Sequence, residues 1–156
     1  MTSSRERIRF YSNREEPYGC FSNFSHHGFE LDGASWPTSE HYFQAQKFAG
    51  REYAERIRRA PNPMEAARLG RVRDVPLRPD WDQVKNESMR RAVWQKFKTH
   101  PELGAVLLAT GDAEIIEAAP NDAYWGAGAD GRGRNELGKI LMEVRDKLRA
   151  EASSRT

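Results

Sequence analysis

Helix start and stop signals recur through most of the sequence and constrain its fold more than any other feature. Thr38 or Ser39 precedes one helical segment as an N-cap, and Gly50 follows that segment as a stop. Asn62 is a second N-cap, with proline at the first helical position and glutamate three residues after the cap. Asp80 and Asn135 are the expected N-caps of two later helices. The predicted helices span residues 40–49, 51–60, 63–71, 81–100, 101–110 and 136–149.

Strand signals are short and few. Residues 8–11 and 28–31 are predicted strands, and Asp32-Gly33 is a turn signal directly after the second. Residues 114–118 are a further candidate strand. We therefore expect a mainly α (α+β) fold, a compact helical domain with a small β element near its N-terminus. The 156 residues fit a single domain with a core over about 8–149, and residues 1–6 and 151–156 are expected to be polar, frayed tails.

Composition narrows the class of protein. A lone cysteine, Cys20, rules out an intramolecular disulfide and suits a reducing compartment. No apolar run approaches the roughly 18 residues of a membrane span, and residues 1–9 lack the apolar core of a secretory signal. These features predict a cytoplasmic protein with no membrane partner. A formal charge of +2 does not indicate a nucleic-acid binder, although Arg56, Arg58 and Arg59 form a local basic cluster.

One polar strip on the segment 40–49 has two interpretations. At about 100° per residue, Glu40, Gln44 and Lys47 share one side of the helix, flanked by Phe43 and Phe48. The strip is either a solvated face with a weak Glu–Lys contact or the wall of an aromatic pocket in which partial burial raises the pKa of Glu40. Helical geometry alone favours the solvated face.

The helix that follows Asp80 has lysines within its apolar side. Lys85 and Lys96 project from the arc formed by Trp81, Met89, Ala92, Val93 and Phe97. Their ammonium groups either extend to solvent or face an anion, which is a carboxylate such as Glu40 or a ligand phosphate.

The glycine-rich segment 121–134 carries Asp122, Trp125 and Gly126, and it ends at the capped start of the last helix. It is either a flexible surface loop or an anion site built from backbone amides at a helix N-terminus. The segment lacks the Gly-Lys-Ser/Thr ending of a P-loop, and no βαβ frame surrounds Gly126 and Gly128, so neither nucleotide fingerprint is supported.

Other catalytic chemistries are less well supported. His26, His27 and His41 have no partner at metal-ligand spacing, so a zinc site is not expected. Cys20 has no identifiable base, and no serine lies in a nucleophile elbow.

Several stretches together resemble the NADAR family, which includes the YbiA-like N-glycosidases. The most specific is the block W-P-T-S-E-H-Y-F-Q-A-Q-K-F over residues 36–48. The resemblance continues in order through the other stretches, which are residues 10–11, 17–24, 81–85, 96–97, 122–128 and 135–145. It covers nearly the whole chain, from about residue 10 to residue 149.

The resemblance implies hydrolysis of a ribosyl C1′–N bond. YbiA-like members cleave phosphorylated intermediates of riboflavin synthesis to a pyrimidine and ribose 5-phosphate, whereas other members remove ADP-ribose from guanine in nucleic acid. We predict the first activity, with a small phosphorylated nucleoside-like substrate. The alternatives are a guanine de-ADP-ribosylase acting on ADP-ribosylated DNA and a non-catalytic module that binds ADP-ribose or a nucleotide. The sequence makes no prediction of oligomeric state.

An oxocarbenium-like transition state requires a carboxylate near C1′, a surface for the base and cations for the phosphate. Glu40 and Asp122 are the predicted catalytic carboxylates. Trp81 and Trp125 are assigned to the base, and Lys85 to the phosphate or the leaving base. Asn23 and Asn135 are assigned to the sugar or phosphate, with Gln44 and Gly126 as further substrate-binding residues. The scheme needs no metal and no cofactor.

Overall fold

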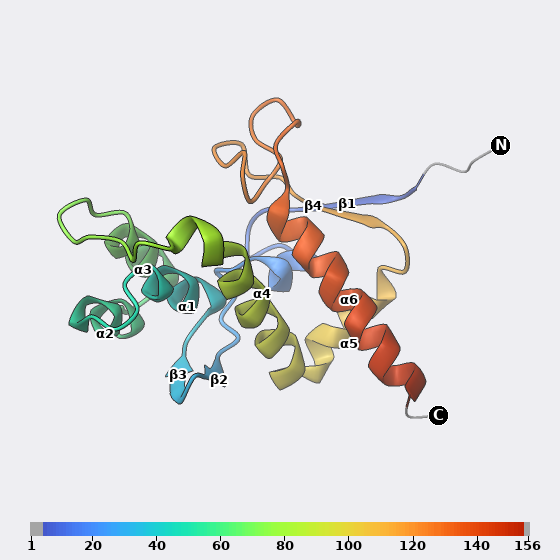
Figure 1. Cartoon of the computed structure of the whole chain (residues 1–156). Helices are drawn as coiled ribbons and strands as arrows, with labels where there is room; N and C mark the ends of the chain where they lie inside the picture. The colour runs from blue at the N-terminus through green and yellow to red at the C-terminus, as the bar shows by residue number, and fades with distance from the viewer. Residues whose placement is uncertain (1–4, 155–156) are drawn as a thin grey trace. The chain divides into compact units, whose positions relative to one another are not determined.

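A computed structural model describes residues 5–154 and divides the chain into two compact units (Figure 1). The central unit is formed by residues 23–99. The terminal unit joins residues 5–22 to residues 100–154.

The central unit contains one hairpin and four helices. The strands are β2 (Phe29–Leu31) and β3 (Ala34–Trp36), and the helices are α1 (Ser39–Gln46), α2 (Glu52–Arg58), α3 (Pro63–Gly70) and α4 (Trp81–Thr99). β2 and β3 pair antiparallel, and the turn between them places Asp32 at φ 55° and Gly33 at φ 77°. Two positive φ values are typical of the tight turn that an Asp-Gly pair favours, which confirms the predicted turn.

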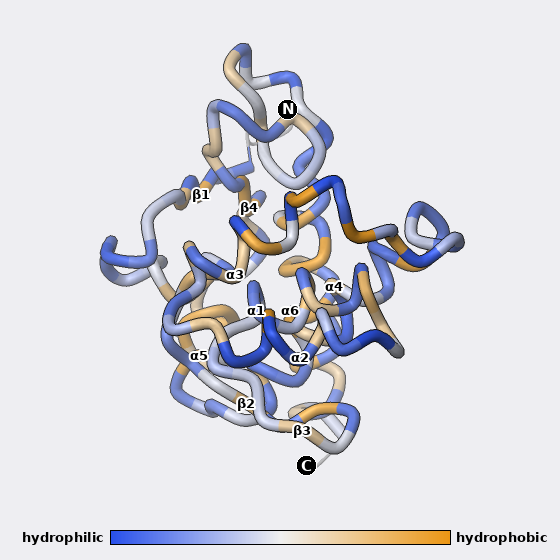
Figure 2. The backbone as a smooth tube through the Cα atoms, turned by 90° about the vertical axis from the view of Figure 1, so that its left-hand side faces the viewer, coloured by the Kyte–Doolittle hydropathy of each residue, from blue (hydrophilic) through white to orange (hydrophobic). Residues whose placement is uncertain are grey.

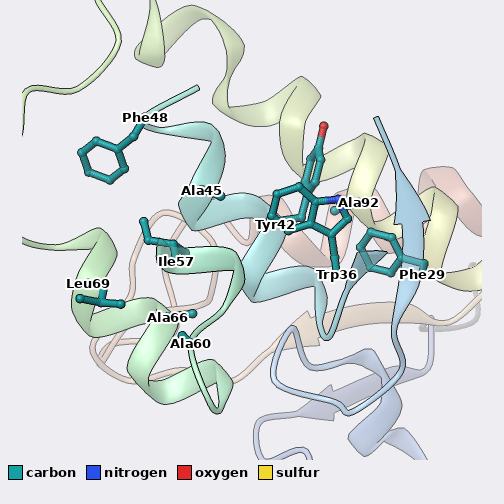
Figure 3. Close-up of a cluster of buried hydrophobic side chains, with 10 residues drawn as sticks. All are labelled: Phe29, Trp36, Tyr42, Ala45, Phe48, Ile57, Ala60, Ala66, Leu69 and Ala92. Atoms are coloured by element: carbon teal, nitrogen blue, oxygen red, sulfur yellow. The ribbon is translucent and has the colours of Figure 1, made fainter. Parts of the chain in front are cut away.

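Helix α1 lies at the centre of this unit. It packs against α2, α3 and α4, and Ser39 through Ala45 are all buried. The apolar cluster around it is drawn in Figure 3, where Tyr42, Ala45 and Phe48 follow α1 among side chains from the hairpin, α2, α3 and α4. Buried polar side chains on such a helix require hydrogen-bond partners, so the polar residues of α1 are held in defined positions.

The terminal unit pairs a strand near the start of the described chain with a strand from its second half. β1 (Arg7–Phe10) lies parallel to β4 (Glu114–Glu117), with Ile8 opposite Ile115. The 3₁₀ helix η1 (Tyr18–Phe21) follows β1, and α6 (Glu136–Ser154) packs against β4 and α5 (Pro101–Ala109). The packed face of α6 is apolar, since Leu137, Ile140, Leu141 and Val144 are buried.

The predicted fold class, mainly α with short strands, is confirmed. All six predicted helices form, with bounds that differ by a few residues. The last helix continues to Ser154, so the expected frayed tail is wrong for residues 151–154, while residues 1–4 and 155–156 lie outside the described chain. The β element is not confined to the N-terminus, because β1 pairs with β4 from the second half of the chain. Strand β3 was not predicted, and a single domain over residues 1–156 stays a prediction beside the two units.

Hydrophobic and hydrophilic segments are mixed over the helices (Figure 2). Among residues 5–154, none of the helices combines the length and the apolarity that crossing a bilayer requires.

Candidate active site

Glu40 lies in the first turn of α1, and its surroundings fix it there. Thr38 caps the helix by accepting a hydrogen bond from the backbone N–H of His41 at 3.1 Å. The backbone N–H of Glu40 donates to the carbonyl oxygen of Asn23 at 3.1 Å. The residue is 9% exposed, so a carboxylate near the positive end of the helix dipole is largely shielded from bulk water. Burial of the whole first turn contradicts the solvated face that geometry alone favoured.

Asn23 clamps the start of α1. Its Oδ1 accepts a hydrogen bond from Ser39 Oγ at 2.9 Å, and its Nδ2 donates to Met89 Sδ at 3.5 Å. Both ends of the amide are thus used inside the central unit. The structure gives Asn23 a positioning function for Glu40, and contact with sugar or phosphate stays a prediction.

Gln44 lies one helical turn after Glu40 and contacts it directly. Its Nε2 donates to Glu40 Oε2 at 2.9 Å, and the glutamine is 5% exposed. Its Oε1 has no hydrogen-bond partner in the described chain and packs against Gly70, where an added Cβ would lie 2.0 Å from that oxygen. The absence of a side chain at Gly70 therefore gives the amide the room to face Glu40.

Lys47 follows on the same side of α1. Its Nζ donates to the carbonyl oxygen of Gly70 at 3.2 Å and lies 5.9 Å from the centre of the Phe43 ring. Burial lowers the pKa of Lys47, while the negative charge of Glu40 acts in the opposite direction. The predicted strip of Glu40, Gln44 and Lys47 is therefore a partly buried polar line beside aromatic side chains.

Trp81 packs against Phe43, beside the polar line of Glu40, Gln44 and Lys47. Its ring lies 5.2 Å from that of Phe43 at an interplanar angle of 56°, and both residues are buried. On α4, Lys85 lies 3.5 Å from Asp82, whereas Lys96 is buried with its Nζ 5.6 Å from the Phe97 ring centre. Lys96 therefore does not extend to solvent. The assignment of Trp81 and Lys85 to the substrate stays a prediction.

Asp122 organises the glycine-rich loop of the terminal unit. Its Oδ1 accepts hydrogen bonds from the backbone N–H groups of Tyr124 and Trp125, at 3.0 and 2.8 Å. The Trp125 ring stands edge-on to Tyr124 at 4.9 Å and is partly exposed. Gly126 is buried, and an added Cβ there would lie 2.9 Å from the carbonyl oxygen of Glu117. The loop is thus ordered by its own contacts, and its predicted catalytic and binding functions remain predictions.

Asn135 differs from the expected N-cap of the last helix. Its φ is 53°, its Oδ1 accepts from the backbone N–H of Glu117 at 3.0 Å, and its Nδ2 donates to the carbonyl oxygen of Ile115 at 2.9 Å. The side chain bonds to β4 instead of to the first turn of α6. Because both ends of the amide are engaged, its function in the structure is to hold the loop on the strand.

His41 is part of the core next to Glu40. Its ring lies between Thr38 Oγ1 at 2.8 Å and the carbonyl oxygen of Ala60 at 3.0 Å, and burial lowers its pKa. The carbonyl requires a donor, so we assign the proton to Nε2 and a neutral ring. Within residues 5–154, no three His, Cys, Asp or Glu side chains are grouped so that they could hold a metal ion.

The structure thus brings Asn23, Glu40 and Gln44 into direct contact in the central unit, with Trp81 and Lys85 at the start of α4. It brings Asp122, Trp125, Gly126 and Asn135 into one loop of the terminal unit. Sequence reasoning missed Gly70, because its importance comes from a side chain that approaches it from another helix.

Comparison with known proteins decides the family. Residues 9–149 match the NADAR domain. The chain belongs to the NADAR family. It is 54% identical to N-glycosidase YbiA of Escherichia coli (strain K12) over 144 residues, which cover 92% of this chain and 89% of the relative. It is 51% identical to an N-glycosidase of Nostoc punctiforme over 137 residues, covering 86% of this chain and 88% of the other.

A solved structure and a further sequence relative are also similar to this chain. An NMR structure of the E. coli protein YbiA superposes with a TM-score of 0.88 and 51% identity, covering 97% of this chain and 89% of that one. A riboflavin biosynthesis protein of Vibrio vulnificus is 43% identical over 147 residues, which are 94% of this chain and 40% of that protein. The family predicted from the sequence motifs is confirmed.

Proposed function

We propose that this chain hydrolyses the ribosyl C1′–N bond of ribosylamino-pyrimidine 5′-phosphates, releasing the pyrimidine base and ribose 5-phosphate. As a NADAR protein more than 50% identical to two proteins named N-glycosidases, it is a hydrolase of N-glycosyl bonds. The specific substrate is the proposed part. The proposed substrate is supported by two similar proteins, one from Vibrio vulnificus and one from Zea mays, which are both named riboflavin biosynthesis proteins.

The observation that carries the proposal is the buried carboxylate of Glu40, held by the clamp at Asn23 and hydrogen-bonded to Gln44. In the reaction, a water oxygen attacks C1′ while the C1′–N bond breaks and its electron pair leaves with the base. Glu40 accepts the proton of the water, and its negative charge stabilises the positive charge that develops on the sugar. Solvent supplies the proton that the departing nitrogen takes up, and Glu40 returns the water proton to solvent, so that the carboxylate is ionised again at the end of the cycle.

The hydrogen bond from Gln44 orients one oxygen of this carboxylate. Lys47 lies further along the same side of α1 and acts on the carboxylate through its charge. The hydrogen bond from Gln44 thus holds the catalytic carboxylate in a productive geometry.

The remaining assignments are proposals of lower priority. In the central unit, Trp81 contacts the base, and Lys85 contacts the phosphate or the leaving base. In the terminal unit, Asp122 is the second carboxylate, and Trp125 offers a partly exposed ring to a base. Substitution of Trp125 by alanine is expected to raise KM with little change in kcat, because a lost stacking surface weakens ground-state and transition-state binding alike.

The second candidate activity is removal of ADP-ribose from guanine in nucleic acid, which also breaks a ribosyl C1′–N bond. A net charge of +2 argues against it, because proteins that bind the phosphate backbone usually carry a basic surface. Two of the arginines that formed the local basic cluster are engaged by Glu55, since Arg58 and Arg59 both donate to that carboxylate. The third possibility is a module that binds ADP-ribose or a nucleotide without catalysis. It is distinguished from both enzymes because it binds its ligand and releases no product.

A side-by-side assay separates these possibilities. Wild-type protein is incubated with a ribosylamino-pyrimidine 5′-phosphate and, separately, with ADP-ribosylated guanine DNA, and release of free base or ADP-ribose is followed. We expect turnover of the first substrate at a kcat/KM at least about 100-fold above the second. Preferential turnover of the DNA would establish the antitoxin-like activity, and binding of either ligand without release would establish the module.

A further inference from the structure

The segment between α3 and α4 is closed into a loop by a single residue. Lys47 donates from Nζ to the carbonyl oxygen of Gly70 at 3.2 Å, where the loop begins. The carbonyl oxygen of the same lysine accepts from the backbone N–H of Arg78 at 2.8 Å, where the loop ends. Side chain and main chain of Lys47 thus hold both ends of residues 71–77 against the C-terminal end of α1.

A pocket of about 360 Å³ lies inside this loop. Its lining includes Lys47, Gly70, Arg71, Arg73, Leu77 and Trp81. The pocket therefore shares Lys47 with the polar line that begins at Glu40, and its lining residues Gly70 and Trp81 contact Gln44 and Phe43 beside that line. All of these residues belong to the central unit.

The pocket is lined by three cations and by no acidic residue. Neither Arg71 nor Arg73 has an ion-pair partner within the described part of the central unit, and both residues are exposed. Burial lowers the pKa of Lys47, Glu40 raises it, and the positive charges of Arg71 and Arg73 lower it further, which agrees with their common place in the pocket lining. An anion in the pocket would relieve this repulsion.

We infer that this pocket binds a phosphate monoester, with Lys47, Arg71 and Arg73 as its ligands. Arginine presents a planar set of donors that matches phosphate oxygens, and lysine adds a point charge. The inference rests on the proposed function for the group attached to the phosphate, which is the ribose of the substrate. Glu40 and Lys47 are seven residues apart on α1, which is roughly 10 Å at 1.5 Å per residue. A ribose 5-phosphate with a hydrogen bond at each end spans such a separation, so Glu40 would face C1′ while the pocket holds the phosphate.

The test compares Arg71→Gln/Arg73→Gln with Arg51→Gln as a matched control. Arg51 is an exposed arginine of the central unit that does not line the pocket. Calorimetry measures Kd for ribose 5-phosphate, inorganic phosphate and ribose in all three proteins. The double variant is expected to bind ribose 5-phosphate roughly 10- to 100-fold more weakly than wild type, with ribose unchanged, because it loses charge-assisted hydrogen bonds. Arg51→Gln is expected to bind like wild type.

Absence of saturable ribose 5-phosphate binding to the wild-type protein would overturn the inference. Equal weakening in Arg51→Gln and the double variant would also overturn it, since that result indicates general charge attraction instead of a site. The binding measurement is independent of turnover. If only the double variant loses ribose 5-phosphate binding and the wild-type protein cleaves no N-glycoside, the pocket is retained and the proposed function is rejected. If the double variant is active with unchanged Kd and KM, the pocket alone is rejected.

Discussion

At the scale of single residues, two positions depend on neighbours that are distant in sequence. Gly70 ends α3 and meets Gln44 of α1, and Asn135 adopts a positive φ while its amide joins the glycine-rich loop to β4. The Asn62 cap and the Asp32-Gly33 turn are predictable because their effects are local. The contact of Gly70 is not predictable, because the sequence does not specify which helix faces it.

Gly70→Ala tests whether the geometry of Gln44 matters. The new Cβ displaces the Gln44 amide from Glu40, which costs stability. Alanine also favours the helix by up to about 1 kcal/mol relative to glycine, and this gain offsets the cost, so the free energy of unfolding is expected to change little. We expect kcat to fall roughly 10-fold or more, as a misplaced catalytic group implies. The same substitution in a Gln44→Ala background has no amide to displace, so an undiminished effect there would contradict this explanation.

Asn135 allows backbone strain and hydrogen bonding to be separated. Asn135→Gly accepts the φ of 53° but loses both hydrogen bonds to β4, so unfolding free energy is expected to fall by about 1–2 kcal/mol. Asn135→Ala loses the same bonds and adds about 1 kcal/mol of left-handed strain. Urea unfolding measures both values, and an alanine variant as stable as the glycine variant would show that the strain is absent.

At the scale of secondary-structure elements, the hairpin is joined to α1 and α4 through one carboxylate. Asp32 Oδ2 accepts from the Tyr42 hydroxyl at 2.7 Å, and its Oδ1 accepts from Arg91 Nη2 at 2.5 Å. The Arg91 guanidinium lowers the pKa of Asp32; burial acts in the opposite direction, and the hydrogen bond from Tyr42 lowers the pKa further. Amphipathic helices and the turn were predictable from periodicity and capping, but this three-element junction required the fold.

Asp32→Asn is expected to make the free energy of unfolding less dependent on pH. Asparagine tolerates the left-handed turn position, so the hairpin is retained. A lowered carboxyl pKa stabilises the folded state above the ordinary value near 4, and that contribution is lost as the pH falls below it. Since both partners are more than one-third exposed, the difference at pH 7 is expected to be only about 0.5–1 kcal/mol.

Urea unfolding of the wild type and Asp32→Asn at pH 7 and pH 3 measures this dependence. The two proteins are expected to converge in stability at the lower pH. A difference that is equal at both values would show that the Asp32 charge does not contribute.

At the scale of the whole molecule, the succession of elements was more predictable than their pairing. Prolines, caps and apolar periodicity predicted the six helices. The parallel pairing of β1 with β4 joins residues 107 positions apart in the sequence, and no local sequence signal indicates it. The candidate site shows the same pattern. The polar strip of Glu40, Gln44 and Lys47 follows from helical period, while its burial follows from α1 being surrounded by α2, α3 and α4.

Glu40→Gln tests the central claim most directly, with Glu52→Gln as control. Both are glutamates in the first turn of a helix of the central unit, but Glu52 is exposed. The measurement is kcat for release of free pyrimidine from a ribosylamino-pyrimidine 5′-phosphate that the wild-type protein turns over. Removing the charge while keeping the shape is expected to lower kcat at least about 100-fold in Glu40→Gln and to leave Glu52→Gln at the wild-type value. Wild-type kcat in a folded Glu40→Gln protein would contradict the assignment of Glu40 as the catalytic carboxylate.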